Sequence, residues 1–173
     1  MPSTILIVED EIDLVPPLEW ALQNAGFHTI AVSRGCEALA LLAGGAEVHV
    51  LLLDLILPDI PGVEVCRRVR VGTTRSLPVI MMSAQAEATD VLAGFVAGAN
   101  EYLVKPFKTH ELVQRVHAVL RGAPQAGAAG AMAHPDIRGR YWTSVRFQSE
   151  VWRVYANVPL GTDPGEALAR LMR

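Results

Sequence analysis

The run of residues 51–57, Leu-Leu-Leu-Asp-Leu-Ile-Leu, constrains the fold more than any other stretch of this chain. Six of its seven residues are aliphatic, which is typical of a strand buried on both faces. Pro58, Pro61 and Gly62 follow closely and end the strand. A strand covered on both sides needs a layer of helices on each face. The run therefore predicts a parallel sheet inside an α/β fold.

The first 122 residues repeat this theme, because apolar runs alternate with helical patterns. We expect strands at residues 4–8, 28–32, 48–53, 78–82 and 101–104. We expect helices at residues 37–43, 63–71, 88–97 and 109–120, the last capped by Thr109, and a first helix that starts late or is distorted near Pro16 and Pro17. Such strict alternation predicts a doubly wound, five-stranded parallel sheet with helices on both faces.

The character of the chain changes after residue 122. Residues 123–133 are rich in Ala and Gly and carry no charge, which predicts a flexible linker. Residues 140–147 and 151–158 alternate in the manner of two strands of a β-hairpin, and Asp163 is placed to cap a short helix. We therefore divide the chain into a domain at residues 1–122, a linker at 123–133, and a small ββα output, docking or dimerisation segment at 134–173.

Charge and cysteine content exclude several classes of protein. Residues 1–122 hold 9 Lys and Arg against 14 Asp and Glu, and residues 123–173 hold 6 against 4, so neither part has a strong basic excess that would indicate nucleic-acid binding. Cys36 and Cys66 form no metal motif or disulfide framework and are typical of reduced cytoplasmic thiols. No basic leader precedes the first strand, and we find no apolar segment long enough to span a membrane. We therefore expect a cytoplasmic protein.

Polar residues gather where the expected strands end. Glu9 and Asp10 follow the first strand, Asp54 lies near the end of the third, Ser83 follows the fourth and Lys105 follows the fifth. The carboxyl ends of parallel strands meet at one edge of a sheet, so these side chains should share one crevice. Taken alone, Asp54 could equally be a buried acid paired with a cation for structural reasons.

The chemistry of this set favours a functional site over a purely structural one. Three adjacent carboxylates repel one another, and a divalent cation with hard oxygen ligands, such as Mg²⁺, relieves that repulsion. One carboxylate could then attack a phosphoryl group. Lys105 and the metal would neutralise the oxygens of that group, and Ser83 could donate a hydrogen bond to one of them.

Four motifs carry a resemblance to a known family. They are Ile-Leu-Ile-Val-Glu-Asp-Glu at 5–11, Leu-Leu-Leu-Asp-Leu-Ile-Leu-Pro at 51–58, Val-Ile-Met-Met-Ser-Ala at 79–84, and Glu-Tyr-Leu-Val-Lys-Pro-Phe at 101–107. Each is weak alone, but all four in this order, on the expected strands, are specific. Over residues 1–122 the chain resembles the receiver domain of two-component response regulators. The resemblance implies a flavodoxin-like sheet with strand order 2-1-3-4-5.

The resemblance also implies a role for each residue of the crevice. Asp54 would accept a phosphoryl group from a phosphohistidine on a sensor histidine kinase or phosphotransfer protein. Glu9, Asp10, Asp54 and the backbone carbonyl of Ile56 would hold Mg²⁺, and Lys105 would pair with the phosphoryl group.

Two further residues would report the phosphorylation state. Ser83 and Tyr102 would form the switch pair, in which the hydroxyl moves to the phosphate and the ring turns inward. The peptide bond between Lys105 and Pro106 would be cis, a form that is expensive except before proline.

We therefore expect a phosphorylation-activated response regulator, an aspartyl phosphoprotein of two-component signal transduction. We expect no enzyme activity beyond its own phosphorylation and autodephosphorylation. The alternative is a receiver-fold scaffold that binds a protein partner independently of phosphorylation.

The sequence leaves open whether residues 134–173 bind DNA, dock on a partner or dimerise. Arg140, Arg146 and Arg153 lie in the expected hairpin and could contact DNA in a role in transcription control, although we favour docking or dimerisation with these arginines in solvent. The expected fourth helix contains no Lys or Arg, whereas dimers of the winged-helix class of regulators usually use a basic residue there. A homodimer of that type is therefore in question.

Overall fold

The structure is a computed structural model, and it describes residues 2–71, 74–84 and 93–121 together with the backbone of residues 134–135, 141–147 and 150–156. The sheet of the first domain contains β1 (Thr4–Val8), β2 (His28–Val32), β3 (Val50–Asp54), β4 (Val79–Ser83) and β5 (Glu101–Val104). The helices are α1 (Val15–Asn24), α2 (Gly35–Ala43), α3 (Gly62–Val71) and α5 (Thr109–Leu120). Residues 93–96 are also helical, and the start of that expected fourth helix lies outside the described residues.

The five strands form one parallel sheet in the order β2-β1-β3-β4-β5. This confirms both the fold class and the expected strand order. β3, which carries the aliphatic run, is the central strand and all five of its residues are buried. Its central position explains why the run is apolar on both faces.

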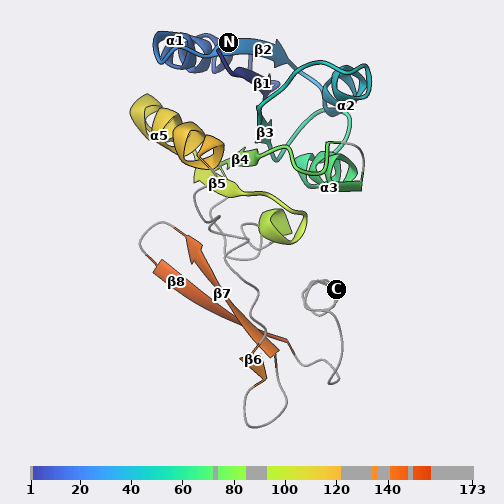
Figure 1. Ribbon diagram of the computed structural model, residues 1–173, viewed down its shortest axis with the longest axis vertical. Coiled ribbons are helices and arrows are strands. Elements are labelled where there is room, and N and C mark those ends of the chain that lie inside the picture. The colour runs from blue at the N-terminus through green and yellow to red at the C-terminus, as the bar shows by residue number, and fades with distance from the viewer. Residues whose placement is uncertain are drawn as a thin grey trace.

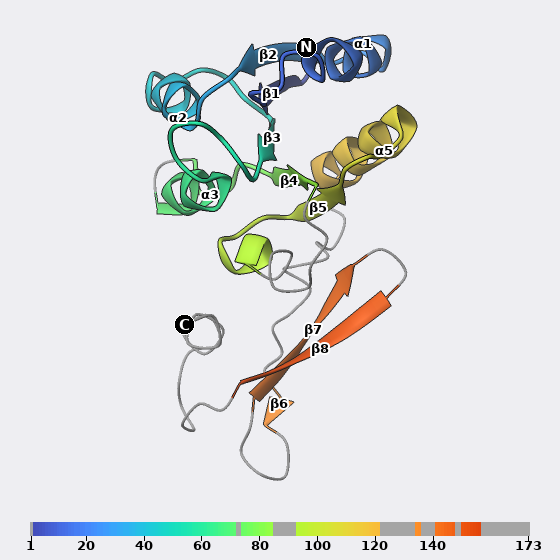
Figure 2. The same ribbon diagram turned by 180° about the vertical axis from the view of Figure 1, so that it is seen from behind.

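Helices cover both faces of the sheet, as Figures 1 and 2 show from opposite sides: α1 and α5 lie on one face, and α2 and α3 lie on the other. Side chains alternate between these faces along each strand. On β1, Ile5 and Ile7 pack with the α1 and α5 side, whereas Leu6 and Val8 pack with the α2 and α3 side. Each face therefore has its own buried cluster.

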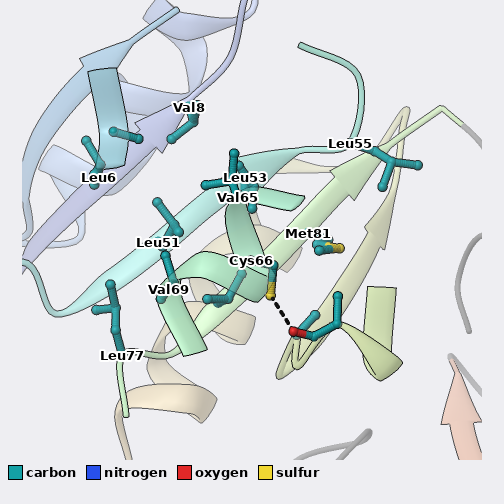
Figure 3. Packing of buried hydrophobic residues seen from close by; sticks show 14 of the residues in the cluster. Leu6, Val8, Leu51, Leu53, Leu55, Val65, Cys66, Val69, Leu77 and Met81 are labelled. Atoms are coloured by element: carbon teal, nitrogen blue, oxygen red, sulfur yellow. Dashed lines mark hydrogen bonds between the residues drawn. The ribbon is translucent and has the colours of Figure 1, made fainter. Parts of the chain in front are cut away.

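The cluster beneath α2 and α3 is shown in Figure 3, where Leu51, Leu53 and Met81 of the sheet meet Val65 and other residues of α3. The sulfur of Cys66, also in α3, lies 3.3 Å from the backbone oxygen of Ala97 and donates a hydrogen bond to it. That bond joins α3 to the turn that leads into β5. Cys36 and Cys66 are both free thiols, as expected.

Three helix starts show how local sequence and tertiary contact each contribute. The α1 helix begins at Val15, before both prolines, so the late start that we expected is wrong. The prolines lie in the first turn, where a missing backbone N–H is tolerated. The α5 helix has the expected bounds, but the expectation that Thr109 caps it is wrong. Lys108 is the extended residue before the helix, and no side chain caps the end.

The α2 helix starts at Gly35, two residues earlier than expected from the apolar pattern. The reason is a contact from the loop after β3. Asp59 accepts hydrogen bonds from the backbone nitrogens of Gly35 at 2.9 Å and Cys36 at 2.8 Å. Asp59 therefore supplies the cap that helices need at their first turn, from 24 residues away in sequence.

The C-terminal part of the chain contains a second sheet, formed by β6 (His134–Pro135), β7 (Tyr141–Phe147) and β8 (Glu150–Ala156). The β7 and β8 strands are antiparallel and place Tyr141 opposite Ala156 and Val145 opposite Trp152. This is the expected hairpin, with the short β6 strand added. The expected linker at 123–133 and the helix starting at Asp163 lie outside the described residues, and no helix in the described part of the chain is long and apolar enough to cross a membrane.

Candidate functional site

The polar residues expected at one edge of the sheet do converge there. Asp54 is the last residue of β3 and is only 5% exposed. Glu9 directly follows β1, whose Val8 pairs with Leu53 of β3, and Glu9 is 1% exposed. Lys105 directly follows β5 on the other side of β4. Parallel pairing thus brings residues 96 positions apart in sequence into contact.

Lys105 lies at the centre of this group. Its Nζ donates hydrogen bonds to Glu9 Oε2 at 2.8 Å and to Asp54 Oδ2. Glu11 Oε1 lies 3.8 Å from the same ammonium. Charged groups removed from water need partners of opposite charge, and here one cation offsets two buried carboxylates.

The other oxygen of Asp54 is held by the backbone. Ile56 N donates a hydrogen bond to Asp54 Oδ1 at 2.9 Å, which fixes the carboxylate at the start of the loop after β3. The loop returns close to Asp54, because Gly62 N donates to Leu55 O at 2.9 Å. A Cβ on Gly62 would lie 2.0 Å from the backbone oxygen of Asp54, so only glycine allows this approach.

Burial and pairing oppose each other in the electrostatics of the site. Burial raises the pKa of Glu9 above its usual value, and the hydrogen bond from Lys105 offsets only part of that effect. For Lys105, burial acts to lower the pKa, but hydrogen bonds to Asp54 and Glu9 outweigh it and raise the pKa. The ammonium therefore keeps its proton, and its positive charge is a permanent feature of the crevice.

The carboxylates also fit a divalent cation. One oxygen each of Glu9, Glu11 and Asp54 can be chosen so that all three lie within 4.8 Å of one another. An all-oxygen acidic set of this kind suits Mg²⁺ or Ca²⁺ better than a softer metal.

Glu11 is the residue that sequence reasoning missed in this acidic set. Asp10, which the sequence predicts as a ligand, is exposed and is not one of the three grouped residues. The signal for Glu11 was the third acid of the Glu-Asp-Glu run, since alternate residues after a strand can point the same way. Asp10 as a metal ligand stays a prediction, as does the carbonyl of Ile56.

Of the two expected switch residues, Ser83 lies at this edge, and Tyr102 lies further back along the sheet. Ser83 is the last residue of β4, next to Val104 of β5, and is 1% exposed. Tyr102 lies in β5 and is also buried, with its ring centroid 6.5 Å from that of Phe95. The peptide bond between Lys105 and Pro106 is cis, as expected.

Comparison with known proteins identifies the family. The family model for the response regulator receiver domain matches residues 5–117. The sensory transduction protein RegX3 of Mycolicibacterium smegmatis is 40% identical over 130 residues, which are 75% of this chain and 55% of that protein. The DNA-binding response regulator MtrA of Mycobacterium leprae is 38% identical over 121 residues, or 70% of this chain and 52% of that protein. The chain thus spans about half the length of these curated relatives.

Solved structures agree with this result. A putative response regulator from Chloroflexus aurantiacus matches with a TM-score of 0.67 and 40% identity, covering 70% of this chain and 99% of the other. The Thermotoga maritima response regulator DrrB, described as an OmpR/PhoB homologue, matches with a TM-score of 0.65 and 29% identity, covering 73% of this chain and 56% of the other. The sheet order, the acidic edge and these matches together show that this chain belongs to the response regulator receiver domain family.

Proposed function

We propose that this chain is a phosphorylation-switched response regulator in which Asp54 accepts a phosphoryl group from a phosphohistidine of a sensor kinase or phosphotransfer protein. The observation that carries the proposal is the contact of Lys105 with both Glu9 and Asp54 at the carboxyl edge of the sheet. A lysine between two buried acids could serve structure alone. Its place beside a third acid, in a chain of this family, favours phosphoryl chemistry.

The transfer forms one bond and breaks one bond. An oxygen of the Asp54 carboxylate bonds to phosphorus while the bond from phosphorus to the donor imidazole nitrogen breaks. The bonding electrons return to that nitrogen. Lys105, which already lies against Asp54, neutralises negative charge as it accumulates on the transferred group. Ile56 N holds the other carboxylate oxygen in place during the transfer.

Mg²⁺ is the metal that we propose for this site. Asp54, Glu9 and the carbonyl of Ile56 would hold it, together with either Asp10 or Glu11. When bound, it supplies positive charge for the phosphoryl oxygens. We propose no catalysis on other molecules: the chemistry ends with autodephosphorylation of Asp54. The cytoplasmic location predicted from the sequence fits a kinase partner and stays a prediction.

The test is labelling with a small phosphodonor. The full chain incubated with acetyl phosphate and Mg²⁺ should gain one phosphoryl group by intact-mass measurement, and Asp54→Asn should gain none. Asp59→Asn is the matched control, because Asp59 lies in the loop after β3 and bonds to α2 rather than to the site. Equal labelling of the Asp54→Asn variant would refute the assignment. A magnesium titration with no response would instead support a phosphorylation-independent scaffold.

The output of the chain is a second question for experiment. MtrA is named as a DNA-binding response regulator, and residues 134–173 could bind DNA or could dock or dimerise. DNA binding by the full chain that weakens steeply with salt and disappears when residues 123–173 are removed would establish the first. Dimerisation or partner binding that needs the same residues, without DNA binding, would establish the second.

A further inference from the structure

A glycine faces the buried ring of Tyr102. Gly94 lies in the helical residues 93–96, where glycine is a poor choice because it loses more backbone freedom on folding than alanine does. A Cβ at position 94 would lie 3.1 Å from Cδ2 and 3.2 Å from Cε2 of Tyr102, and 2.8 Å from Sδ of Met81. Helix propensity therefore favours alanine at this position, but the packing leaves no room for its Cβ.

The surroundings leave the ring little freedom to move aside. Tyr102 is 2% exposed, and Met81, its Cα partner on the neighbouring strand, is fully buried. Phe95, the residue after Gly94, lies beside the Tyr102 ring with centroids 6.5 Å apart. In a close-packed interior, an added methyl group displaces side chains from their preferred rotamers.

We infer that Gly94 is a positioning residue for the switch, and that its missing Cβ creates the space in which the Tyr102 ring takes its inward position. The inference rests on the proposed function, since Tyr102 matters as a switch only if phosphorylation is coupled to its ring. A methyl group at position 94 would press on the buried ring as well as on Met81, so it raises the energy of the inward ring relative to a ring that has turned outward. Gly94→Ala should therefore bias the chain toward the outward state.

The first test concerns packing and needs no phosphorylation. Gly94→Ala should lower the urea midpoint, although helix propensity alone would raise it. The same change made in a Tyr102→Phe background should have the same effect, because Phe keeps both ring carbons that the new Cβ would meet. In a Tyr102→Leu background the effect should be much smaller. An equal loss in the Leu background would assign the clash to Met81 and overturn the inference.

The second test concerns the position of the ring. Nitration of Tyr102 in the full chain, followed by peptide mass spectrometry, should be faster in Gly94→Ala than in wild type, on the order of tenfold, the population change that one extra core methyl group typically produces. Gly44→Ala is the matched control. Gly44 follows α2 with an ordinary φ of −73°, and a Cβ there would meet no atom of Tyr102 within 4 Å. Unchanged nitration in Gly94→Ala, or an equal rise in Gly44→Ala, would overturn the inference.

The third test separates this inference from the function on which it rests. Gly94→Ala should be labelled by acetyl phosphate more slowly than wild type, because the inward ring state is less populated. Normal labelling of a variant with a more exposed Tyr102 would refute the link to the switch and leave Asp54 as the acceptor. Absence of labelling in wild type would refute the proposed function, whereas the packing and nitration results would stand.

Discussion

At the scale of single residues, Glu101 shows how burial and pairing compete outside the site. Its carboxylate accepts a hydrogen bond from Arg115 Nη1 at 2.8 Å, and its side chain is 12% exposed. Burial raises the pKa of Glu101 above 4.5, and the charge and hydrogen bond of Arg115 lower it only in part. The folded chain therefore holds this proton more tightly than the unfolded chain does.

The sign of the resulting pH dependence follows from linkage. The contribution of Glu101 to the free energy of unfolding is fully present below pH 4.5 and is lost as the pH rises through the raised pKa of the folded state. Glu101→Gln cannot titrate, so its stability relative to wild type should increase between pH 4.5 and neutral pH, as measured by urea unfolding. Glu111→Gln is the control, because Glu111 lies 3.7 Å from the same arginine but is more exposed. A parallel pH profile for wild type and Glu101→Gln would contradict the prediction.

At the scale of elements, the start of α2 depends on a cap from another loop. Asp59 bonds to the backbone nitrogens of Gly35 and Cys36, and these bonds hold its pKa well below the usual range. Asp59→Ala should unprotect those two amides in hydrogen exchange while the amides of α3 keep their protection, because only the first turn of α2 loses its partner. Asp59→Asn keeps an acceptor oxygen, so its protection of these two amides should lie between that of the wild type and that of Asp59→Ala. Unchanged protection in Asp59→Ala would show that the cap is dispensable.

A second element-scale contact joins α3 to the turn before β5. Arg70 donates hydrogen bonds to Leu77 O at 2.6 Å, Gly98 O at 2.9 Å and Asn100 Oδ1 at 2.8 Å. Burial lowers the pKa of the guanidinium, so much of its hydration has been exchanged for these acceptors. Arg70 therefore joins α3 to the loops at the amino ends of β4 and β5, at the edge of the sheet away from Asp54.

The effect of breaking this contact can be measured against a neighbour on the same helix. Arg70→Met should lower the free energy of unfolding by about 1–3 kcal/mol, because it leaves part-buried acceptors without a donor. Arg67→Met should change it by less than about 1 kcal/mol, since Arg67 is 57% exposed and lies 3.9 Å from Glu64. Equal effects in urea unfolding would show that Arg70 acts only as a surface charge.

At the scale of the whole molecule, the buried clusters that the structure describes lie within the first domain. Both buried clusters of the described part consist of residues between Ile5 and Leu120. A fragment of residues 1–122 should therefore unfold cooperatively with the same urea midpoint as the first transition of the full chain. A large fall in that midpoint would show that residues 123–173 pack on the domain and contribute to its stability.

The order of residue types along the chain is enough to predict the sheet and the edge at which the candidate site lies. Apolar runs such as residues 50–53 indicate burial on both faces, and alternation of strands with helices allows a parallel sheet whose carboxyl ends meet. This pattern alone predicts that Glu9, Asp54, Ser83 and Lys105 share one edge. Local periodicity is sufficient for this, because it records which face of each element is buried.

The contacts between individual groups depend instead on tertiary packing. Asp59 extends α2, Glu11 joins Glu9 and Asp54, and Gly94 leaves room for Tyr102. Such contacts join side chains and backbone from different elements and loops. The hydrophobic pattern does not record whether a Cβ or a carboxylate oxygen lies a few ångströms away. They depend on how the loops and helices pack over the sheet, which local propensity does not encode.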